Sequence, residues 1–325
     1  MPNFSIYNKC NNSCLMCTNP DKFWQLKGGF NFSCLERRIK RFHDGKEEFL
    51  EDYRDVFDIS GGEPTLSPHL IPLSKKINQL FPDSKIRCLT NGRNFFYAGY
   101  AENFLKKIQN KFELIIPIHG HTPKLHDSIT RVPGSFLQTV KGLKNIFQYK
   151  KHSHHIEIRI IIHKQNYKFL KEILLFLKNN FSKIDRVVFM FFEVEGQAKK
   201  NITKLKVSYS KISPYLRKIL PYLHSFSDIR FYHFPLCVLP IVFFPHTWRT
   251  LPESDTIFLK QCQLCSVKAF CLGIPITSMQ YMQIKEFQPI RDNLMLETTP
   301  YFWHHPIKKI PKQYNLFKKH HKIFK

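Results

Sequence analysis

The chain has 325 residues, of which 43% are hydrophobic, so it is long enough for one large domain with a buried core and a smaller second one. Its 50 Lys and Arg outnumber its 25 Asp and Glu, and the resulting formal charge of +25 is typical of proteins that attract polyanions. No apolar run is long enough to span a membrane, and nine cysteines without a signal peptide argue for reduced or metal-bound thiols. We therefore expect a soluble, cytoplasmic protein without a membrane partner.

The hydrophobic pattern predicts strands that alternate with amphipathic helices. Strands are expected at residues 4–7, 56–60, 85–90, 112–118, 156–163 and 186–192. Between them lie amphipathic segments such as 70–80, 100–109, 136–148 and 169–179. Six strands joined by helical crossovers imply a parallel α/β sheet, with ligands bound at the carboxyl ends of the strands.

Three cysteines near the N-terminus form the most informative feature of the chain. Cys10, Cys14 and Cys17 have three and then two residues between them. Thiolates at this density select zinc or an iron–sulfur cluster. If one loop supplies three ligands to a four-iron cluster, the remaining iron is open to a non-protein ligand. Spacing alone leaves a zinc loop as an alternative.

A second motif follows the predicted strand 56–60. Gly61 and Gly62 permit a sharp turn and a close backbone approach to a ligand. Pro64 favours an extended conformation at Glu63, which holds the carboxylate at the end of the strand. A carboxylate in that place can accept a hydrogen bond from a ligand ammonium group. An ordinary Gly-Gly turn would be preferred if the motif stood alone.

Together the two motifs resemble those of the radical S-adenosylmethionine (SAM) enzymes. Cys10, Cys14 and Cys17 match the CxxxCxxC loop of that family, and residues 61–64 match its GGEP motif. The resemblance implies a partial (βα)6 TIM-like barrel that holds a catalytic [4Fe-4S] cluster and SAM. It further implies that SAM is cleaved reductively to a 5′-deoxyadenosyl radical, which abstracts hydrogen from a substrate. An electron donor such as flavodoxin or ferredoxin would supply the electron.

The resemblance also assigns residues to SAM. Glu63 and the backbone of Gly61 and Gly62 would hold its ammonium group. Met16 stands where the family usually has an aromatic residue before the last cysteine, so adenine would pack against a thioether. Asn91 belongs to a Thr-Asn-Gly sequence that resembles a turn of the family.

Further polar residues are expected at the carboxyl ends of the later strands. Arg131 is similar in position to an arginine that pairs with the SAM carboxylate in related enzymes. The ribose-binding serine of the family would fall at Pro117, which has no hydroxyl group. Alternatives stay open for the other polar residues. The histidines could line the substrate pocket, bind a metal or be ordinary loop residues, and the glutamates could face the substrate or be solvated. These residues are His119, His121, His126, Glu193 and Glu195.

A second set of cysteines lies in the C-terminal part of the chain. It consists of Cys237, Cys262, Cys265 and Cys271, which can close a tetrahedral zinc site or hold a complete four-iron cluster. The one-plus-three arrangement resembles a twitch domain, the half-sized relative of SPASM that carries one auxiliary cluster. We expect a barrel at 1–205, this second, auxiliary [4Fe-4S] domain at 206–300 and a basic tail at 301–325. The remaining cysteines, Cys34 and Cys88, are expected to be plain thiols.

The substrate class is the least determined property. Less specific segments across residues 1–275 resemble the radical SAM maturases of His-Xaa-Ser peptide systems, which implies a ribosomally made peptide as substrate. The Lys- and His-rich tail, with interleaved aromatic residues, is compatible with RNA binding, although the same composition is typical of disordered segments. The alternatives are modification of RNA or of a nucleotide-derived small molecule, and a zinc-stabilised RNA-binding protein without enzymatic activity.

Overall fold

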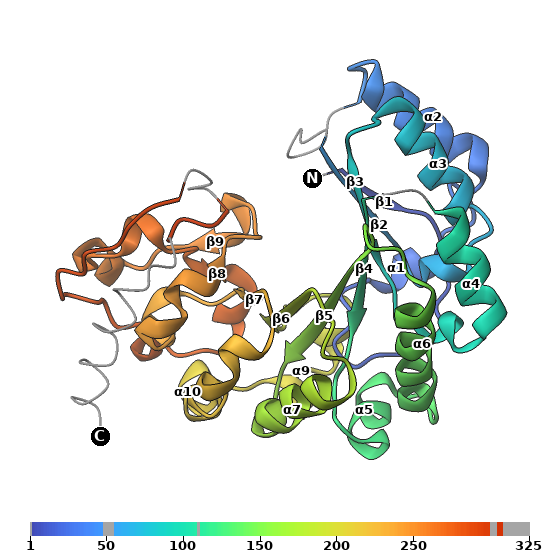
Figure 1. Cartoon of the computed structure of the whole chain (residues 1–325). Coiled ribbons are helices and arrows are strands. Elements are labelled where there is room, and N and C mark those ends of the chain that lie inside the picture. The colour runs from blue at the N-terminus through green and yellow to red at the C-terminus, as the bar shows by residue number, and fades with distance from the viewer. Residues whose placement is uncertain (1, 48–54, 109–110, 300–303, 308–325) are drawn as a thin grey trace.

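The computed structural model describes residues 2–47, 55–108, 111–299 and 304–307. Its main element is a parallel sheet of eight strands whose spatial order follows the chain from β1 to β8 (Figure 1). The strands are β1 (Asn3–Ser5), β2 (Val56–Ser60), β3 (Lys85–Leu89), β4 (Phe112–Pro117), β5 (His155–Ile162), β6 (Arg186–Phe191), β7 (Ile229–Tyr232) and β8 (Thr247–Trp248). Parallel neighbours in chain order, joined by helical crossovers, confirm the predicted α/β fold of a partial TIM-like barrel.

Helices cover the outer side of the curved sheet (Figure 1). The α-helices among the described residues are α1 (Asp21–Trp24), α2 (Phe32–His43), α3 (Leu70–Leu80), α4 (Ala98–Lys107), α5 (Pro123–Thr130), α6 (Ser135–Tyr149), α7 (Leu170–Asn180), α8 (Gly196–Lys200), α9 (Ile202–Leu205) and α10 (Tyr209–Arg217), of which α1 and α8 contribute residues to the cavity at the strand ends. Local sequence fixes several of their starts. The side chain of Asn31 accepts a hydrogen bond from Cys34 N (2.9 Å) at the start of α2, and Thr122 caps α5 ahead of Pro123.

The six predicted strands and four predicted helices are all present, and their ends agree with the prediction to within two residues. The sheet, however, continues beyond the sixth strand. Sequence analysis missed β7 and β8 because they have only four and two residues, too few to show a periodic pattern. The sheet thus extends into the segment 206–300, for which we had predicted a separate domain.

The inner face of the sheet carries a layer of ion pairs below the strand ends. Arg186 bonds to Glu113, Glu157 (2.9 Å) and Asp228 (2.7 Å), and Arg159 donates to Glu157 (2.6 Å). Burial alone would raise the pKa of Glu157, but the surrounding guanidinium groups hold it well below its ordinary range. Charged side chains therefore fill the inside of the barrel below the carboxyl ends of the strands, and the open space lies at those ends.

The C-terminal part consists mainly of short 3₁₀ turns around a two-stranded antiparallel ribbon, β9 (Thr256–Ile257) and β10 (Ile274–Pro275). The 3₁₀ helices of the chain are η1 (Pro64–Leu66), η2 (Arg93–Phe96), η3 (Tyr167–Phe169), η4 (Leu220–Ser225), η5 (Leu236–Val238), η6 (Ile241–His246), η7 (Glu253–Asp255), η8 (Lys260–Leu264), η9 (Lys268–Phe270), η10 (Ile276–Gln280) and η11 (Ile284–Glu286). Within the described residues no helix combines the length and apolar character that crossing a bilayer requires.

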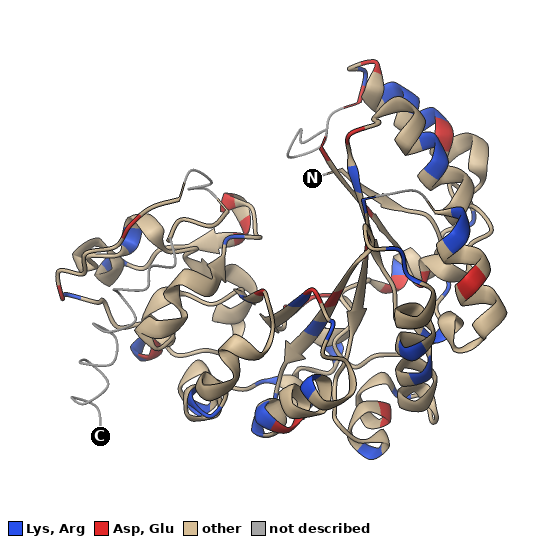
Figure 2. Cartoon of the chain, in the orientation of Figure 1, with Lys and Arg blue, Asp and Glu red and all other residues tan. Residues whose placement is uncertain are grey.

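The excess of positive charge is spread over the surface. Figure 2 shows Lys and Arg on the helices around the sheet and on the C-terminal part, rather than gathered on one element. Of the predicted basic tail, 301–325, all but residues 304–307 lies outside the described residues.

Candidate functional site

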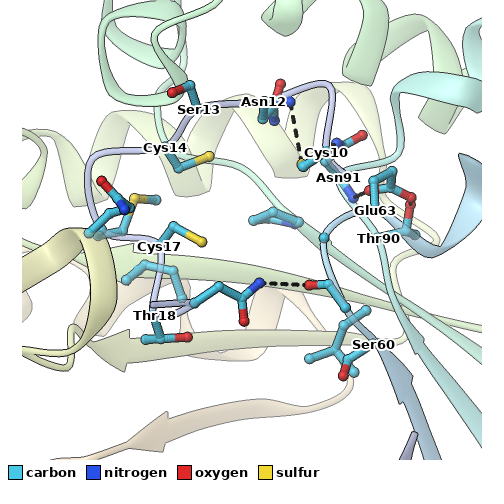
Figure 3. A pocket seen from close by; sticks show the side chains of 18 of the residues that line it. Cys10, Asn12, Ser13, Cys14, Cys17, Thr18, Ser60, Glu63, Thr90 and Asn91 are labelled. Carbon is cyan, nitrogen blue, oxygen red and sulfur yellow. Dashed lines mark hydrogen bonds between the residues drawn. The ribbon is translucent and has the colours of Figure 1, made fainter. Parts of the chain in front are cut away.

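A cavity of about 1010 Å³ opens at the carboxyl ends of the barrel strands. All residues that the sequence assigned to the N-terminal cluster and to SAM line this one cavity: Cys10, Cys14, Cys17, Met16, Gly61, Gly62, Glu63, Asn91 and Arg131. Figure 3 shows the sulfur atoms of the three cysteines pointing toward a common space. Segments more than 100 residues apart in sequence thus meet at one end of the barrel.

The two glycines bring the end of β2 against the start of the cysteine loop. β1 and β2 are in parallel register, with Ser5 opposite Ser60, so the chain after each strand continues side by side. Gly62 N donates to Tyr7 O (2.7 Å), and a Cβ atom on either glycine would collide with the backbone of residues 7–9. Gly61 also has φ +136°, which disfavours a side chain. Close approach of two backbones therefore explains both glycines.

Glu63 is buried and holds neighbouring elements together. Its Oε1 accepts from Thr65 N (3.0 Å), Thr65 Oγ1 (2.5 Å) and Thr90 Oγ1 (2.5 Å), and its Oε2 accepts from Asn91 N (2.7 Å). Burial raises the pKa of Glu63, whereas these hydrogen bonds oppose the rise. These four donors equal the roughly four acceptor sites of a carboxylate, and Oε2, with a single donor among the described residues, is the less crowded of the two oxygens.

Residues of the turn after β3 form hydrogen bonds to the first half of the cysteine loop. Asn91 Nδ2 donates to Asn11 Oδ1 (2.6 Å) and lies 3.8 Å from Cys10 Sγ. Arg93 donates to Asn11 O and to Asn12 Oδ1 (2.8 Å). These contacts hold an irregular loop in one position without help from regular secondary structure.

Residues at the end of α5 form hydrogen bonds to the middle of the cysteine loop. Arg131, in the left-handed conformation (φ +58°), donates to Ser13 O and to Ser13 Oγ (3.0 Å). Backbone bonds run from Ser13 N to Thr130 O (3.0 Å) and from Leu15 N to Ile129 O (2.9 Å). Arg131 therefore reaches the cavity already bonded to the loop.

The start of α8 holds the end of the loop. The amides of Gln197 and Ala198 donate to Cys17 O at 2.8 and 3.3 Å. Gly196 lies so close to Thr18 that a Cβ atom would collide with the Thr18 carbonyl group. The connection after β6 and the last cysteine are thus packed as one unit.

The thiols of this loop are protonated unless a cationic group binds to them. Burial raises the pKa of Cys10 to about 11 and also raises the pKa of Cys14 and Cys17, although the nearby guanidinium of Arg131 lowers the last two. Buried thiols ionise when a metal supplies positive charge. The described residues contain no group of three or more His, Cys, Asp or Glu that could hold a metal ion. The three inward-facing sulfur donors fit a cluster of several irons with one open corner.

Glu193 is the acidic residue on the opposite side of the cavity. It follows β6 and lines the cavity, whereas Glu195 is exposed. Burial, reinforced by Asp255 and opposed by Arg159, raises the pKa of Glu193 to about 7. Its nearest basic partner is His233 Nδ1 at 3.7 Å, and burial lowers the pKa of that histidine to about 4. At neutral pH His233 is therefore uncharged, and the charge of Arg159 offsets only part of the effect of burial on the Glu193 carboxyl group.

The three histidines after β4 are placed differently. His119 lines the cavity beside Pro117, and its backbone amide donates to Nδ1 of the buried His126 (3.3 Å). Burial lowers the pKa of His126 to about 4 and that of His119 well below its usual value, so both are neutral at physiological pH. The ring of His121 lies against Phe169.

The second cysteine set gathers in the C-terminal part. Cys237, Cys262, Cys265 and Cys271 line one small pocket of about 20 Å³. Burial raises the pKa of Cys237 and Cys271, and the neighbouring cysteines raise the pKa of both further. Leu236 N and Gly273 N each donate to Cys271 Sγ at 3.4 Å. Cys34 and Cys88 lie apart from both sets, in α2 and β3.

Sequence reasoning missed several residues that build the cavity. Arg93, which supports the cysteine loop, follows the Thr-Asn-Gly sequence, and Arg159 lies in the predicted strand 156–163, but neither was assigned a role. Met190 and Phe192 line the cavity from the end of the predicted strand 186–192, whereas no sequence signal marks Trp24. Position at the carboxyl end of a predicted strand was the available sign for Arg93, since side chains there converge on the ligand site.

Comparison with known proteins gives a family match. The model of the family described as "Radical SAM superfamily" matches residues 4–177. No curated protein matches the sequence.

Solved structures show a shared fold at low identity. Native anSMEcpe, with bound AdoMet and a Cp18Cys peptide, is 17% identical, with 70% of this chain and 62% of that chain covered and a TM-score of 0.51. SuiB of Streptococcus suis, bound to its precursor peptide SuiA, is 20% identical, with 69% and 46% covered and a TM-score of 0.48. Coproporphyrinogen III oxidase (HemN) of Escherichia coli, described as a radical SAM enzyme, is 14% identical, with 69% and 52% covered and a TM-score of 0.47. The chain spans about half the length of SuiB.

Proposed function

The chain belongs to the radical SAM superfamily, and from this premise we propose that it is a maturase that modifies a ribosomally made peptide. The observation that carries the enzymatic part is the convergence of both family motifs on one cavity. As a member of the family, the protein uses a [4Fe-4S] cluster and SAM, which together supply a 5′-deoxyadenosyl radical that takes hydrogen from the substrate.

We assign the residues around the cavity as follows. Cys10, Cys14 and Cys17 hold the cluster. Glu63, through Oε2, the oxygen with fewer hydrogen bonds, binds the SAM ammonium group together with the backbone of Gly61 and Gly62. Asn91 holds the turn against the loop.

Two further residues complete the SAM site in this proposal. Met16 is buried at the cavity wall and offers its thioether to adenine. Arg131 uses two of its five N–H donors on Ser13 and has others left for the SAM carboxylate.

The lining of the cavity, rather than its size, supports a peptide substrate, because the cluster and SAM would share the same volume. Pockets for single drug-sized ligands have volumes of roughly 300–1,000 Å³. The cavity reaches the upper end of that range, and its far wall, with Phe192 and Glu193, offers both an apolar and a polar surface to a peptide side chain. The peptide bound in the anSMEcpe structure is consistent with this substrate class.

For the second cysteine set we propose an auxiliary [4Fe-4S] cluster. Four cysteines gather at one small pocket, and four thiolates complete the ligation of a four-iron cluster. A substrate would then have no open iron there. Zinc is the alternative for this set, and iron and zinc analysis separates the two.

The net charge of +25 favours one other substrate class, RNA or a nucleotide-derived molecule. Nucleic acid that co-purifies with the protein and is lost at high salt would support it. A short peptide gene beside the gene for this chain would support the maturase.

The first test is 5′-deoxyadenosine formation from SAM and dithionite by anaerobically reconstituted protein, measured by chromatography. We expect formation above that of Cys14→Ala, which lacks one cluster ligand and should be inactive while still folded. Cleavage by Cys14→Ala at the wild-type rate would contradict the cluster assignment. Adding candidate peptides and RNA to the same assay then tests the substrate class.

A further inference from the structure

Arg93 is the one cationic side chain of the β3 turn that contacts the cysteine loop. It follows the Thr-Asn-Gly sequence directly and begins η2. Its Nη1 donates to the main-chain carbonyl of Asn11 and to Asn12 Oδ1 (2.8 Å), and its Nε donates to Gln138 Oε1 of α6 (2.7 Å). The half-buried guanidinium thus joins α6 to two consecutive residues of the loop.

These contacts extend to a cluster ligand. Asn12 N donates to Cys10 Sγ at 3.3 Å, so the peptide that Arg93 holds also carries a hydrogen bond to the sulfur. The backbone of Arg93 is fixed in turn, because its amide donates to Asn91 Oδ1 (3.0 Å). A planar guanidinium can make such divergent bonds at fixed angles, whereas a lysine ammonium on a flexible stem holds only one point.

We propose that Arg93 is a positioning residue for the metal-binding loop, which fixes the Asn11–Asn12 peptide and thereby the orientation of Cys10 and its N–H···S bond. This role rests on the proposed function, since it presupposes a cluster at Cys10, Cys14 and Cys17. Hydrogen bonds to ligating sulfur and nearby positive charge both raise the reduction potential of an iron–sulfur cluster. Arg93 therefore acts on cluster retention through geometry and on the potential through both effects.

The test compares Arg93→Gln and Arg93→Lys with the wild-type protein, all reconstituted anaerobically. Arg41→Gln is the matched control, because it removes the same charge from an exposed arginine of α2 that bonds to Lys46 O. The readouts are the rate of iron loss to a chelator and the midpoint potential of the reduced EPR signal that changes when SAM is added. That signal reports the cluster with an open iron and not a fully ligated one.

We expect Arg93→Gln to lose iron 10–100-fold faster, the usual cost of removing an outer partner of a metal ligand, and to have a lower potential. Arg93→Lys keeps the positive charge but loses the planar guanidinium and its divergent hydrogen bonds. Its iron loss should therefore be fast, while the midpoint potential of the cluster stays closer to that of the wild type. Arg41→Gln should match the wild type in both.

The proposal would be overturned if Arg93→Gln lost iron at a rate within twofold of the wild-type rate and had the wild-type midpoint potential within error. If Arg93→Gln does not fold, Arg93→Lys and Asn12→Ala decide, since each breaks part of the same contact, and wild-type retention in both overturns it. A wild-type protein without any SAM-responsive EPR signal would instead refute the proposed function.

Discussion

The two cysteine sets of this protein are built in different ways. The N-terminal loop is held by side chains and amides from the β3 turn, the end of α5 and the start of α8, and it faces a cavity of about 1010 Å³. The C-terminal set lies among short 3₁₀ turns and lines a pocket of only about 20 Å³. The N-terminal set has three cysteines with open space beside them. The C-terminal set has four cysteines with almost no open space beside them.

Under the proposed function, this difference separates a metal centre with an open coordination position from a fully ligated one. An open coordination position is useful only if the fold leaves room for a ligand and keeps the loop still while the ligand binds. The N-terminal set meets both conditions through residues far away in sequence. The C-terminal set provides enough sulfur for complete ligation, so additional space would serve no purpose.

The largest effect that would test this contrast is expected from Cys265→Ala. If the C-terminal set holds a complete cluster, the variant should lose roughly four iron atoms per chain, because a four-iron cluster needs its ligands. Cleavage of SAM should continue, since the N-terminal loop is untouched. Iron analysis and the 5′-deoxyadenosine assay measure the two outcomes. Unchanged iron would point to zinc or to no metal at the second set.

Glu193 lines the cavity and is influenced by Asp255 of the C-terminal part. Glu193→Gln should change the pH dependence of the free energy of unfolding. The pKa of this carboxyl rises from 4.5 in the unfolded chain to about 7 in the folded one. Between these values the folded protein holds a proton that the unfolded chain has released, so the free energy of unfolding falls as pH rises through this window. At pH 8 the loss is complete and amounts to at most about 3 kcal/mol.

Glutamine does not titrate, so Glu193→Gln should be more stable than the wild type at pH 8 and similar to it at pH 4.5. Urea unfolding at the two pH values measures the difference. Glu195→Gln is the comparison variant: Glu195 is exposed and does not line the cavity, but burial and Glu193 also raise the pKa of its carboxyl group, so the pH dependence should change in the same direction. The same pH dependence in Glu193→Gln and the wild type would show that the folded chain compensates this carboxyl group.

The smallest effect is expected at Glu63, whose carboxylate holds the β3 turn and lines the proposed SAM site. Glu63→Gln should weaken SAM binding by about 1.5–3 kcal/mol, the value of a hydrogen bond to a charged group, as measured by calorimetry. Thr65→Val removes one hydroxyl donor to the same carboxylate without altering its charge. An equal loss in both variants would mean that Glu63 acts only by holding the turn, and unchanged affinity in Glu63→Gln would remove its assigned role.

Local patterns predicted much of the fold. Buried strands and amphipathic helices repeat with clear periods, so six strands and four helices were located to within two residues. Sequence patterns did not reveal β7 and β8, because pairing of β7 with β6 and of β8 with β7, rather than their own few residues, makes them strands. The residues of the candidate site were found through short motifs, which are local in sequence.

The sequence by itself determined which sulfur and carboxylate groups exist and how the strands and helices alternate, because spacing and periodicity are properties of neighbouring residues. Only the tertiary structure decided that Gly62 is needed for contact with Tyr7, that Arg93 and Arg131 form hydrogen bonds to the cysteine loop, and that Glu193 is half-buried beside a neutral histidine. Each of these depends on segments distant in sequence that meet at the carboxyl ends of parallel strands. Desolvation and hydrogen bonding at that place follow from packing, which no single segment encodes.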